Sequence, residues 1–310
     1  MTNSLDSKNI LVTGATGFIG AHLCQALLLS GYQVFGLTHS GDTQRVSHLL
    51  QQKPFQLLQG DIRSTDSLYP LLKNNRISAI FHLAARLPHE QDLNDPFPSF
   101  DTNVRGTINL LHAATLSNVS RFIYSSSIDV YTEPPDYLPV DEKHPTHPRT
   151  NYGVSKLAGE FYTHLYSQTI KTTILRYSIV YGKGAKTGGA VNRFIHQALI
   201  AKPLTIYGEG EQSNDFVYVT DVVKANILAF EKDQPGTYNI GSGMEIKIRD
   251  LAQTVVKLTK SASEIISTDI KSNRPFRFAL DISLAGKRLG YYPLALENGL
   301  SDYIKQCQMG

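Results

Sequence analysis

The sequence predicts an α/β protein, with a doubly wound parallel sheet followed by a second, smaller C-terminal lobe. Three observations support this fold class. The 310 residues are 41% hydrophobic, which is enough for a full core. Short β-rich runs alternate with helical apolar patterns, and the first run leads directly into a glycine-rich turn. Such alternation is typical of a parallel sheet that is covered on both faces and binds ligands at the carboxyl ends of its strands.

The first element is a strand from Asn9 to Thr13, and a helical pattern follows the turn as far as Ser30. The turn itself contains Gly14, Gly17 and Gly20. One glycine makes a tight turn, one lets backbone N–H groups approach a pyrophosphate, and one allows the helix to pack on the strand. The spacing therefore predicts a Rossmann-type dinucleotide site, with the phosphates at the helix N-terminus.

The second strand, Gln33 to Thr38, ends where a dinucleotide fold usually places an acidic residue on the adenosine ribose. Thr38, His39 and Ser40 occupy this place. The missing carboxylate removes the repulsion that would exclude a 2′-phosphate, and Arg45 is close enough in sequence to compensate for one. Both NAD and NADP remain open as the cofactor.

The remaining elements divide the chain into two parts. Further strands are predicted at 55–58, 79–85 and 121–125, with a helix at 107–117. After Arg176 the pattern loosens, with helices at 191–201, 250–258 and 285–289 and short strands at 205–207 and 215–219. We expect residues 1–175, with parts of 215–243, to form the NAD(P)-binding domain, and residues 176–214 and 244–310 to form the substrate-binding lobe.

A candidate proton donor and acceptor lies on the helix predicted from Asn151 to His164. Tyr152 and Lys156 are four residues apart, which puts both side chains on one helix face. An ammonium group held beside a phenol stabilises the phenolate and lowers the pKa of the phenol from about 10. The pair can therefore exchange protons with a bound substrate at neutral pH.

The composition argues against several other classes of protein. The net charge of +3 is dispersed, without a block of Lys and Arg, so we expect no nucleic-acid or membrane partner. No run of eighteen apolar residues exists, and residues 1–9 lack the apolar middle of a secretory signal, so we expect a cytoplasmic protein. Cys24 and Cys307 have no metal-ligand spacing, which predicts neither a disulfide nor a metal site.

Taken in order, the motifs resemble those of the extended short-chain dehydrogenase/reductase family, the NAD-dependent sugar-nucleotide epimerases and dehydratases. The motifs are Thr13-Gly-Ala-Thr-Gly-Phe-Ile-Gly20, Gly60-Asp61-Ile62, His82-Leu-Ala-Ala85, Asn103-Val-Arg-Gly-Thr107, Ser125-Ser-Ser-Ile-Asp-Val-Tyr131, Tyr152-Gly-Val-Ser-Lys156, Leu175-Arg-Tyr177, Ile206-Tyr-Gly-Glu-Gly210, Asp215-Phe-Val-Tyr-Val219 and Tyr238-Asn-Ile-Gly-Ser-Gly243. The resemblance also implies a homodimer, in which the helices at 107–117 and 151–164 pair across a two-fold axis as a four-helix bundle.

The resemblance implies a catalytic trio of Ser127, Tyr152 and Lys156. Tyr152 would take the proton of a sugar hydroxyl as hydride passes to the nicotinamide, while Ser127 bonds the same oxygen. Asp61 would contact the adenine end of the cofactor. The full set expected at the cofactor is Gly14, Thr16, Gly17, Phe18, Ile19, Gly20, Thr38, His39, Ser40, Asp61, Ile62, Leu83, Ala84, Ala85, Asn103, Ser125, Tyr152, Lys156 and Tyr177.

The substrate side departs from the family pattern. Relatives that bind a nucleoside diphosphate often carry Asn at the position of Ile179 and Arg at the position of Asn214. Arg274 stands where the family commonly has a phosphate-binding arginine, and Arg193 adds positive charge. We therefore expect Arg193, Asn214 and Arg274 to bind either a sugar nucleotide or a simpler keto or hydroxy compound without a diphosphate.

The expected function is an NAD(P)-dependent epimerase of a sugar nucleotide, acting by transient oxidation to a keto-sugar and re-reduction. An NADPH-dependent ketoreductase with the same trio is the first alternative. A 4,6-dehydratase is the second, although Ile128 stands where many dehydratases carry an acid. Asp129 is either an extra general base or a turn aspartate that bonds its own backbone. A non-catalytic NAD(P)-binding protein is the remaining alternative.

Overall fold

In the computed structural model, the described residues are 9–87, 95–185, 189–270 and 276–309. Contacts within the chain divide it into two compact units. The first unit comprises residues 1–133, 145–176 and 223–238, and the second comprises residues 134–144, 177–222 and 239–310. The division into a cofactor-binding domain and a substrate-binding lobe stays a prediction.

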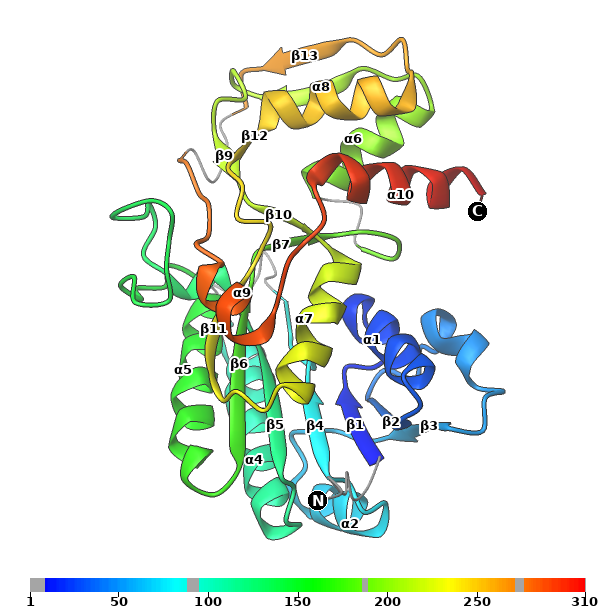
Figure 1. Ribbon diagram of the computed structural model, residues 1–310, viewed down its shortest axis with the longest axis vertical. Helices are drawn as coiled ribbons and strands as arrows, with labels where there is room; N and C mark the ends of the chain where they lie inside the picture. Colours follow the sequence, from blue (N-terminus) through cyan, green and yellow to red (C-terminus); the bar gives the residue numbers. More distant parts are fainter. Residues whose placement is uncertain (1–8, 88–94, 186–188, 271–275, 310) are drawn as a thin grey trace. The chain divides into compact units, whose positions relative to one another are not determined.

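A seven-stranded sheet organises the first unit (Figure 1). Its strand order is β11 (Gly236–Ile240), β6 (Lys171–Tyr177), β5 (Arg121–Ser127), β4 (Ala79–His82), β1 (Asn9–Thr13), β2 (Gln33–Thr38) and β3 (Phe55–Gln59). β1 pairs in parallel with both β2 and β4, so that Ile10 lies between Val34 and Ala79. The strand order therefore reverses at β1, and a doubly wound sheet binds its ligands at such a switch point. The predicted fold class is confirmed.

Alternating side chains of these strands support the helices of the first unit. Leu11, Ile80 and Phe122 belong to one buried cluster, which also takes in side chains of α2 (Thr65–Asn74) and α4 (Gly106–Leu116). Phe81 points the other way, because successive residues of a strand face opposite sides, and its ring lies 5.8 Å from that of Phe230 in α7 (Val219–Glu231). The other helical elements are α1 (Phe18–Leu29), η1 (Gln44–Leu49), α3 (Phe97–Phe100), η3 (Asp101–Arg105), η4 (Ile128–Val130), α5 (Asn151–Leu165) and η5 (Tyr166–Gln168).

The second unit contains three short strand pairs and four helices among its described residues. The pairs are β7 (Ile179–Tyr181) with β10 (Phe216–Tyr218), β8 (Leu204–Tyr207) with β13 (Ile265–Thr268), and β9 (Ser213–Asn214) with β12 (Ile246–Lys247). The helices are α6 (Ala190–Leu199), α8 (Ile248–Thr259), α9 (Ser283–Leu289) and α10 (Leu296–Met309). Asp215 organises this unit, because its buried carboxylate accepts hydrogen bonds from the backbone N–H groups of Ser242 (2.7 Å) and Gly243 (3.0 Å). Within the described residues, every helix is too short or too polar to cross a bilayer.

Candidate active site

The glycine turn after β1 is shaped by close backbone contacts. Gly14 has a φ of +68°, and a side-chain carbon placed there would lie 2.8 Å from the backbone nitrogen of Ala84. A side-chain carbon on Gly20 would overlap the carbonyl oxygen of Gly14. Gly17 lies at the N-cap of α1, where no side chain caps the helix and the first turn carries no acidic residue. The free N–H groups and the positive end of the helix dipole therefore suit a pyrophosphate, as the spacing predicts.

A directed chain of hydrogen bonds runs through His82, at the end of β4. The Thr107 hydroxyl donates to the Asn103 carbonyl (2.7 Å), so it accepts from His82 Nε2 (2.9 Å). Nδ1 of His82 is then the acceptor, and it receives the Thr13 hydroxyl proton (2.8 Å), while that oxygen accepts from the Ala84 N–H group (3.1 Å). Burial first, and then the nearby charge of Lys156, lower the pKa of His82 to about 3. A neutral His82 thus holds the backbone of Ala84, at the expected nicotinamide side.

Asn103 connects the loop that follows β4 to α5. Its side chain accepts from the Arg86 backbone N–H group (2.7 Å) and donates to the Arg86 carbonyl (2.9 Å) and to the Ser155 hydroxyl (2.9 Å). The residue lies in η3, a turn of π-helix immediately before α4. Such turns often occur at functional sites. Asn103 therefore ties Arg86, which follows Leu83, Ala84 and Ala85, to α5. Its place at the nicotinamide stays a prediction.

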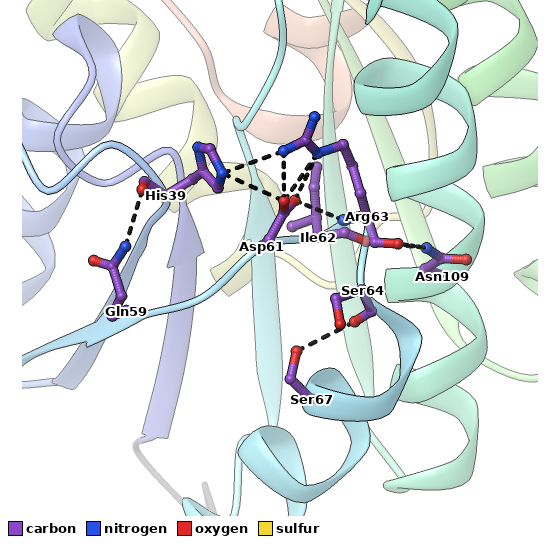
Figure 2. A network of polar contacts seen from close by, with 8 residues as sticks. All are labelled: His39, Gln59, Asp61, Ile62, Arg63, Ser64, Ser67 and Asn109. Carbon is purple, nitrogen blue, oxygen red and sulfur yellow. Dashed lines mark hydrogen bonds and ion pairs between the residues drawn. The ribbon is translucent and has the colours of Figure 1, made fainter.

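The carboxyl ends of β2 and β3 form the expected adenosine side (Figure 2). Thr38 is buried, and its hydroxyl lies 3.1 Å from that of Thr16 in the glycine turn. The exposed ring of His39 lies 3.2 Å from the Arg63 guanidinium, measured from Nε2 to Nη2. Arg63 donates to both carboxylate oxygens of Asp61, which lowers the pKa of that carboxyl group. The end of β2 therefore presents no carboxylate of its own, and the acidic group that lies nearby is already neutralised by an arginine.

The remaining residues at this end have defined local roles. Ile62 is buried and packs so closely on Gly106 that a side-chain carbon on that glycine would lie 2.7 Å from it. The Ser40 hydroxyl accepts from the backbone N–H group of Asp42 (3.3 Å). Arg45 lies exposed on η1. Phe18 and Ile19 occupy the first turn of α1, and both are partly buried.

Ser127 and Asp129 follow one another at the carboxyl end of β5. Ser127 is the last residue of the strand, and its hydroxyl oxygen accepts the backbone N–H group of Asp129 at 3.2 Å. That bond leaves the hydroxyl proton of Ser127 for another acceptor. Asp129 lies in η4 and is partly buried. Ser125, two residues before Ser127 on the same strand, is buried.

Two glycines allow α5 to approach these residues. A side-chain carbon on Gly153 would overlap the carbonyl oxygen of Asp129, and one on Gly159 would overlap the hydroxyl group of Tyr124. The helix begins at Asn151 because the Thr150 hydroxyl accepts the N–H group of Gly153 (3.0 Å), as an N-cap does. α5 therefore packs against both η4 and β5.

Tyr152 and Lys156 lie on the inner face of α5, with only 9% and 3% of their surfaces exposed. Burial lowers the pKa of Lys156 to about 7, and this fall is opposed by the negative charge of Glu160. The structure thus places the tyrosine and lysine on the helix face that packs on β5. The assignment of a catalytic role to Ser127, Tyr152, Lys156 and Asp129 stays a prediction.

Glu160 and Arg176 are functional candidates for which the sequence motifs predicted no role, although Arg176 lies in the motif Leu175-Arg-Tyr177. They form a buried ion pair between α5 and the end of β6. The available sequence signal was a glutamate four residues after Lys156, and therefore on the inner helix face, where an unpaired charge would be costly.

The expected substrate residues Arg193 and Asn214 lie in the second unit, and Arg274 lies outside the described residues. Arg193 donates to the Tyr207 hydroxyl (3.2 Å) and the Thr205 carbonyl (3.3 Å), which leaves its buried Nε without a partner. Asn214 is also buried, and its Oδ1 has no partner. Unpaired buried polar atoms of this kind are suited to a ligand. Tyr177, the last residue of β6, is buried. Its contacts assign it to the second unit, whereas the other residues expected at the cofactor belong to the first unit.

The described residues contain no group of three His, Cys, Asp or Glu side chains suited to an ion. Cys24 is buried and Cys307 is exposed, and both are free thiols. Burial raises the pKa of the Cys24 thiol, so that it stays protonated at neutral pH.

Comparisons with known proteins agree with this geometry. A profile described as "NAD dependent epimerase/dehydratase family" matches residues 10–241. UDP-glucose 4-epimerase of Mycolicibacterium smegmatis is 32% identical over 305 residues, which cover 95% of this chain and 97% of the relative. The crystal structure of UDP-glucose 4-epimerase with UDP-glucose from Thermotoga maritima has a TM-score of 0.89 and 30% identity, with 97% and 99% of the two chains covered. UDP-glucuronic acid 4-epimerase from Bacillus cereus, in complex with UDP-glucuronic acid and NAD, has a TM-score of 0.85 and 35% identity, with 96% and 99% covered.

Proposed function

Since the chain belongs to the NAD dependent epimerase/dehydratase family, we propose that it epimerises a nucleotide sugar by transient oxidation of one carbon to a ketone. The resemblance read from the motifs is thereby confirmed. The observation that carries the proposal is the inward placement of Tyr152 and Lys156 on α5, which packs against the carboxyl end of β5 where Ser127 lies. A tyrosine in this setting can take a proton from a sugar hydroxyl and return it.

In the proposed reaction, Tyr152, Ser127 and Lys156 would act on the substrate and the loops after β1 and β4 would bind the cofactor. A bound NAD would supply the acceptor, and then the donor, of the hydride of the sugar carbon. Tyr152 takes the hydroxyl proton at its phenol oxygen, and the Ser127 hydroxyl donates to the same substrate oxygen as negative charge develops there. Lys156 stabilises the phenolate form of Tyr152. The glycine turn and the loop held by His82 and Asn103 would bind the two ends of the dinucleotide.

We propose a UDP-hexose as the substrate and carbon 4 as the reacting centre, because the relatives described above are UDP-sugar 4-epimerases. The unpaired Nε of Arg193 is a buried donor that suits a phosphate oxygen, and Oδ1 of Asn214 is a buried acceptor that suits a hydroxyl or N–H group. Both atoms support a polar ligand in the second unit. Ile179 and Asn214 stand where relatives often carry Asn and Arg. Of the residues expected at the substrate, Arg193 is therefore the cation that lies among the described residues.

We also propose a homodimer through the helices of the first unit. Val154, Phe161 and Leu165 form an exposed apolar stripe on α5, at spacings of seven and four residues. Phe97 and Phe100 of α3, which packs against α5, are exposed as well. Exposed apolar side chains grouped on neighbouring helices in this way are typical of a protein interface. We further propose that the protein is cytoplasmic, because its two cysteines are free thiols and free thiols suit a reducing compartment.

The test is to incubate the purified protein with UDP-glucose or UDP-glucuronic acid and catalytic NAD, and to follow the sugars by proton NMR. An epimerase should produce a mixture of the two C4 epimers without a net change in NADH absorbance. A ketoreductase would instead consume NADPH in proportion to product, and a 4,6-dehydratase would yield a 4-keto-6-deoxy sugar. A protein that binds NAD but leaves every UDP-hexose unchanged would overturn the proposed reaction.

A further inference from the structure

Arg176 and Glu160 form a fork-shaped ion pair in the interior of the first unit. Nε of Arg176 lies 2.9 Å from one carboxylate oxygen of Glu160, and Nη2 lies 2.7 Å from the other. The two side chains are only 8% and 6% exposed. Burying such a pair costs desolvation energy that its attraction often fails to recover, so stability alone is a weak reason for its presence.

Two further hydrogen bonds connect the pair to the strand and turn that carry Ser127 and Asp129. The Ser126 hydroxyl donates to Glu160 at 2.5 Å, and Ser126 immediately precedes Ser127. Nη1 of Arg176 donates to the Tyr131 hydroxyl at 2.9 Å, and Tyr131 immediately follows η4, which contains Asp129. The Arg176 guanidinium also lies 4.8 Å from the Tyr131 ring centroid, within the range of a cation–π contact. The ion pair thus fastens β5, η4 and α5 to one another.

The same carboxylate acts on the charge of Lys156, one helix turn earlier. Among the described residues, the titratable groups that interact with this lysine include Tyr124, His82 and Glu160, and Tyr152 lies one helix turn before it on the same buried face. Burial raises the pKa of Tyr124 far above its usual value and lowers that of His82 to about 3, so both are neutral near pH 7. Glu160, held in its ion pair with Arg176, supplies the negative charge that favours the ammonium form of Lys156.

We propose that Glu160 is a positioning residue of the epimerase: with Arg176 it holds the elements that carry Ser127 and Tyr152 together, and its carboxylate keeps Lys156 charged beside Tyr152. This inference deepens the proposed function and concerns the same site. Glu160 acts through Lys156 and the backbone of its neighbours.

The decisive measurement is an NMR titration of Lys156 in protein labelled with ¹³C at the lysine ε-carbon, with the resonance assigned from Lys156→Met. The parent protein is expected to show a midpoint near pH 7. In Glu160→Gln the loss of the negative charge should lower this midpoint by about one pH unit. Asp233→Asn is the matched control, because Asp233 pairs with Lys171 at the opposite end of β6 and should leave the midpoint unchanged.

Activity then tests the consequence for the reaction. Removing a nearby negative charge eases the loss of a proton from the Tyr152–Lys156 pair, so the acidic limb of the pH profile of kcat should move to lower pH in Glu160→Gln, with KM little changed. Structural damage alone would lower kcat at every pH without moving that limb. Ser126→Ala keeps the charges of Glu160 and Arg176. It should lower kcat without moving the acidic limb of the pH profile.

If Glu160→Gln fails to fold, the double variant Glu160→Leu with Arg176→Met removes both charges and preserves apolar volume. It should also lower the Lys156 midpoint, but by less than Glu160→Gln, because the positive charge of Arg176 is lost as well. An unshifted Lys156 midpoint in a folded variant would overturn the inference. A parent protein that is inactive on every UDP-sugar yet shows the shifted midpoint on mutation would refute the proposed reaction and leave the electrostatic role of Glu160 supported.

Discussion

The ammonium nitrogen of Lys156 lies 4.6 Å from the centroid of the Tyr124 ring, which makes the middle of β5 a platform for the inner face of α5. The Tyr124 hydroxyl also donates to the Lys156 carbonyl at 3.3 Å and fills the space beside Gly159. One aromatic side chain of the strand therefore contacts the catalytic candidate, its backbone and the glycine that permits their approach.

Tyr152→Phe removes the phenol oxygen that would exchange the substrate proton and preserves the ring that packs in the site. We expect kcat to fall by about 10³-fold or more while NAD affinity changes little. Steady-state epimerisation kinetics and calorimetric titration with NAD measure the two quantities. Tyr162→Phe, on the exposed side of the same helix, is the control. Full activity in Tyr152→Phe would falsify the catalytic assignment.

Gly159→Ala should displace α5 from β5, because the added methyl group would overlap the Tyr124 hydroxyl. We expect a loss of about 1–3 kcal/mol in the free energy of unfolding, as in other overpacked cores, together with a lower kcat. Chemical denaturation followed by circular dichroism measures the loss. Gly189→Ala is the matched control, since a side-chain carbon at Gly189 meets nothing within 4 Å. Equal stability of the two variants would contradict this account of the packing.

Lys156→Met should change how stability depends on pH. The pKa of Lys156 is about 7 in the folded protein and about 10.4 in the unfolded chain, so between these values the unfolded chain binds the proton that the folded protein has lost. The parent should therefore gain stability from this group as the pH rises from 7 to 9, and the variant should lack that gain. Urea denaturation at several pH values measures the difference, with Lys53→Met, at an exposed position, as the control. If the stability of the parent and of Lys156→Met changed with pH in parallel, the pKa of Lys156 would not be lowered in the folded protein.

Thr38→Asp introduces a carboxylate at the end of β2, where the protein now has a hydroxyl bonded to Thr16. Repulsion between this carboxylate and a 2′-phosphate should weaken NADP binding by about tenfold or more relative to NAD. Calorimetric titration with each dinucleotide measures the ratio of affinities. Gln51→Asp adds the same charge at an exposed position and should leave the ratio unchanged. An unaltered ratio in Thr38→Asp would place the discrimination elsewhere.

Phe161→Glu should separate the proposed homodimer, because it puts a charge into the apolar stripe of α5, where the Phe161 side chain is 66% exposed. Analytical ultracentrifugation is expected to show a dimer for the parent protein and a monomer for the variant at micromolar concentration. Leu29→Glu, at an 83% exposed leucine of α1, should remain dimeric. A monomeric parent would exclude the proposed assembly.

The sequence by itself determined the sheet, the glycine turn and the face of α5 that carries Tyr152 and Lys156, because these depend on local periodicity and on glycine spacing. It also identified Thr38 as the residue at the end of β2. These features are encoded by neighbours in the chain and need no knowledge of long-range contacts.

Only the tertiary structure decided which distant groups set the charges around the site. The directed chain through His82 joins residues 25 and 69 positions away, and the pair of Glu160 with Arg176 closes between a helix and a strand 16 positions apart. Such contacts depend on how β4, β5, β6 and α5 pack, and their effect depends on burial, which lowers the pKa of Lys156 and of His82. A one-dimensional pattern shows that a charged residue falls on an inner face, whereas the partner that makes its burial tolerable is found only when the chain folds.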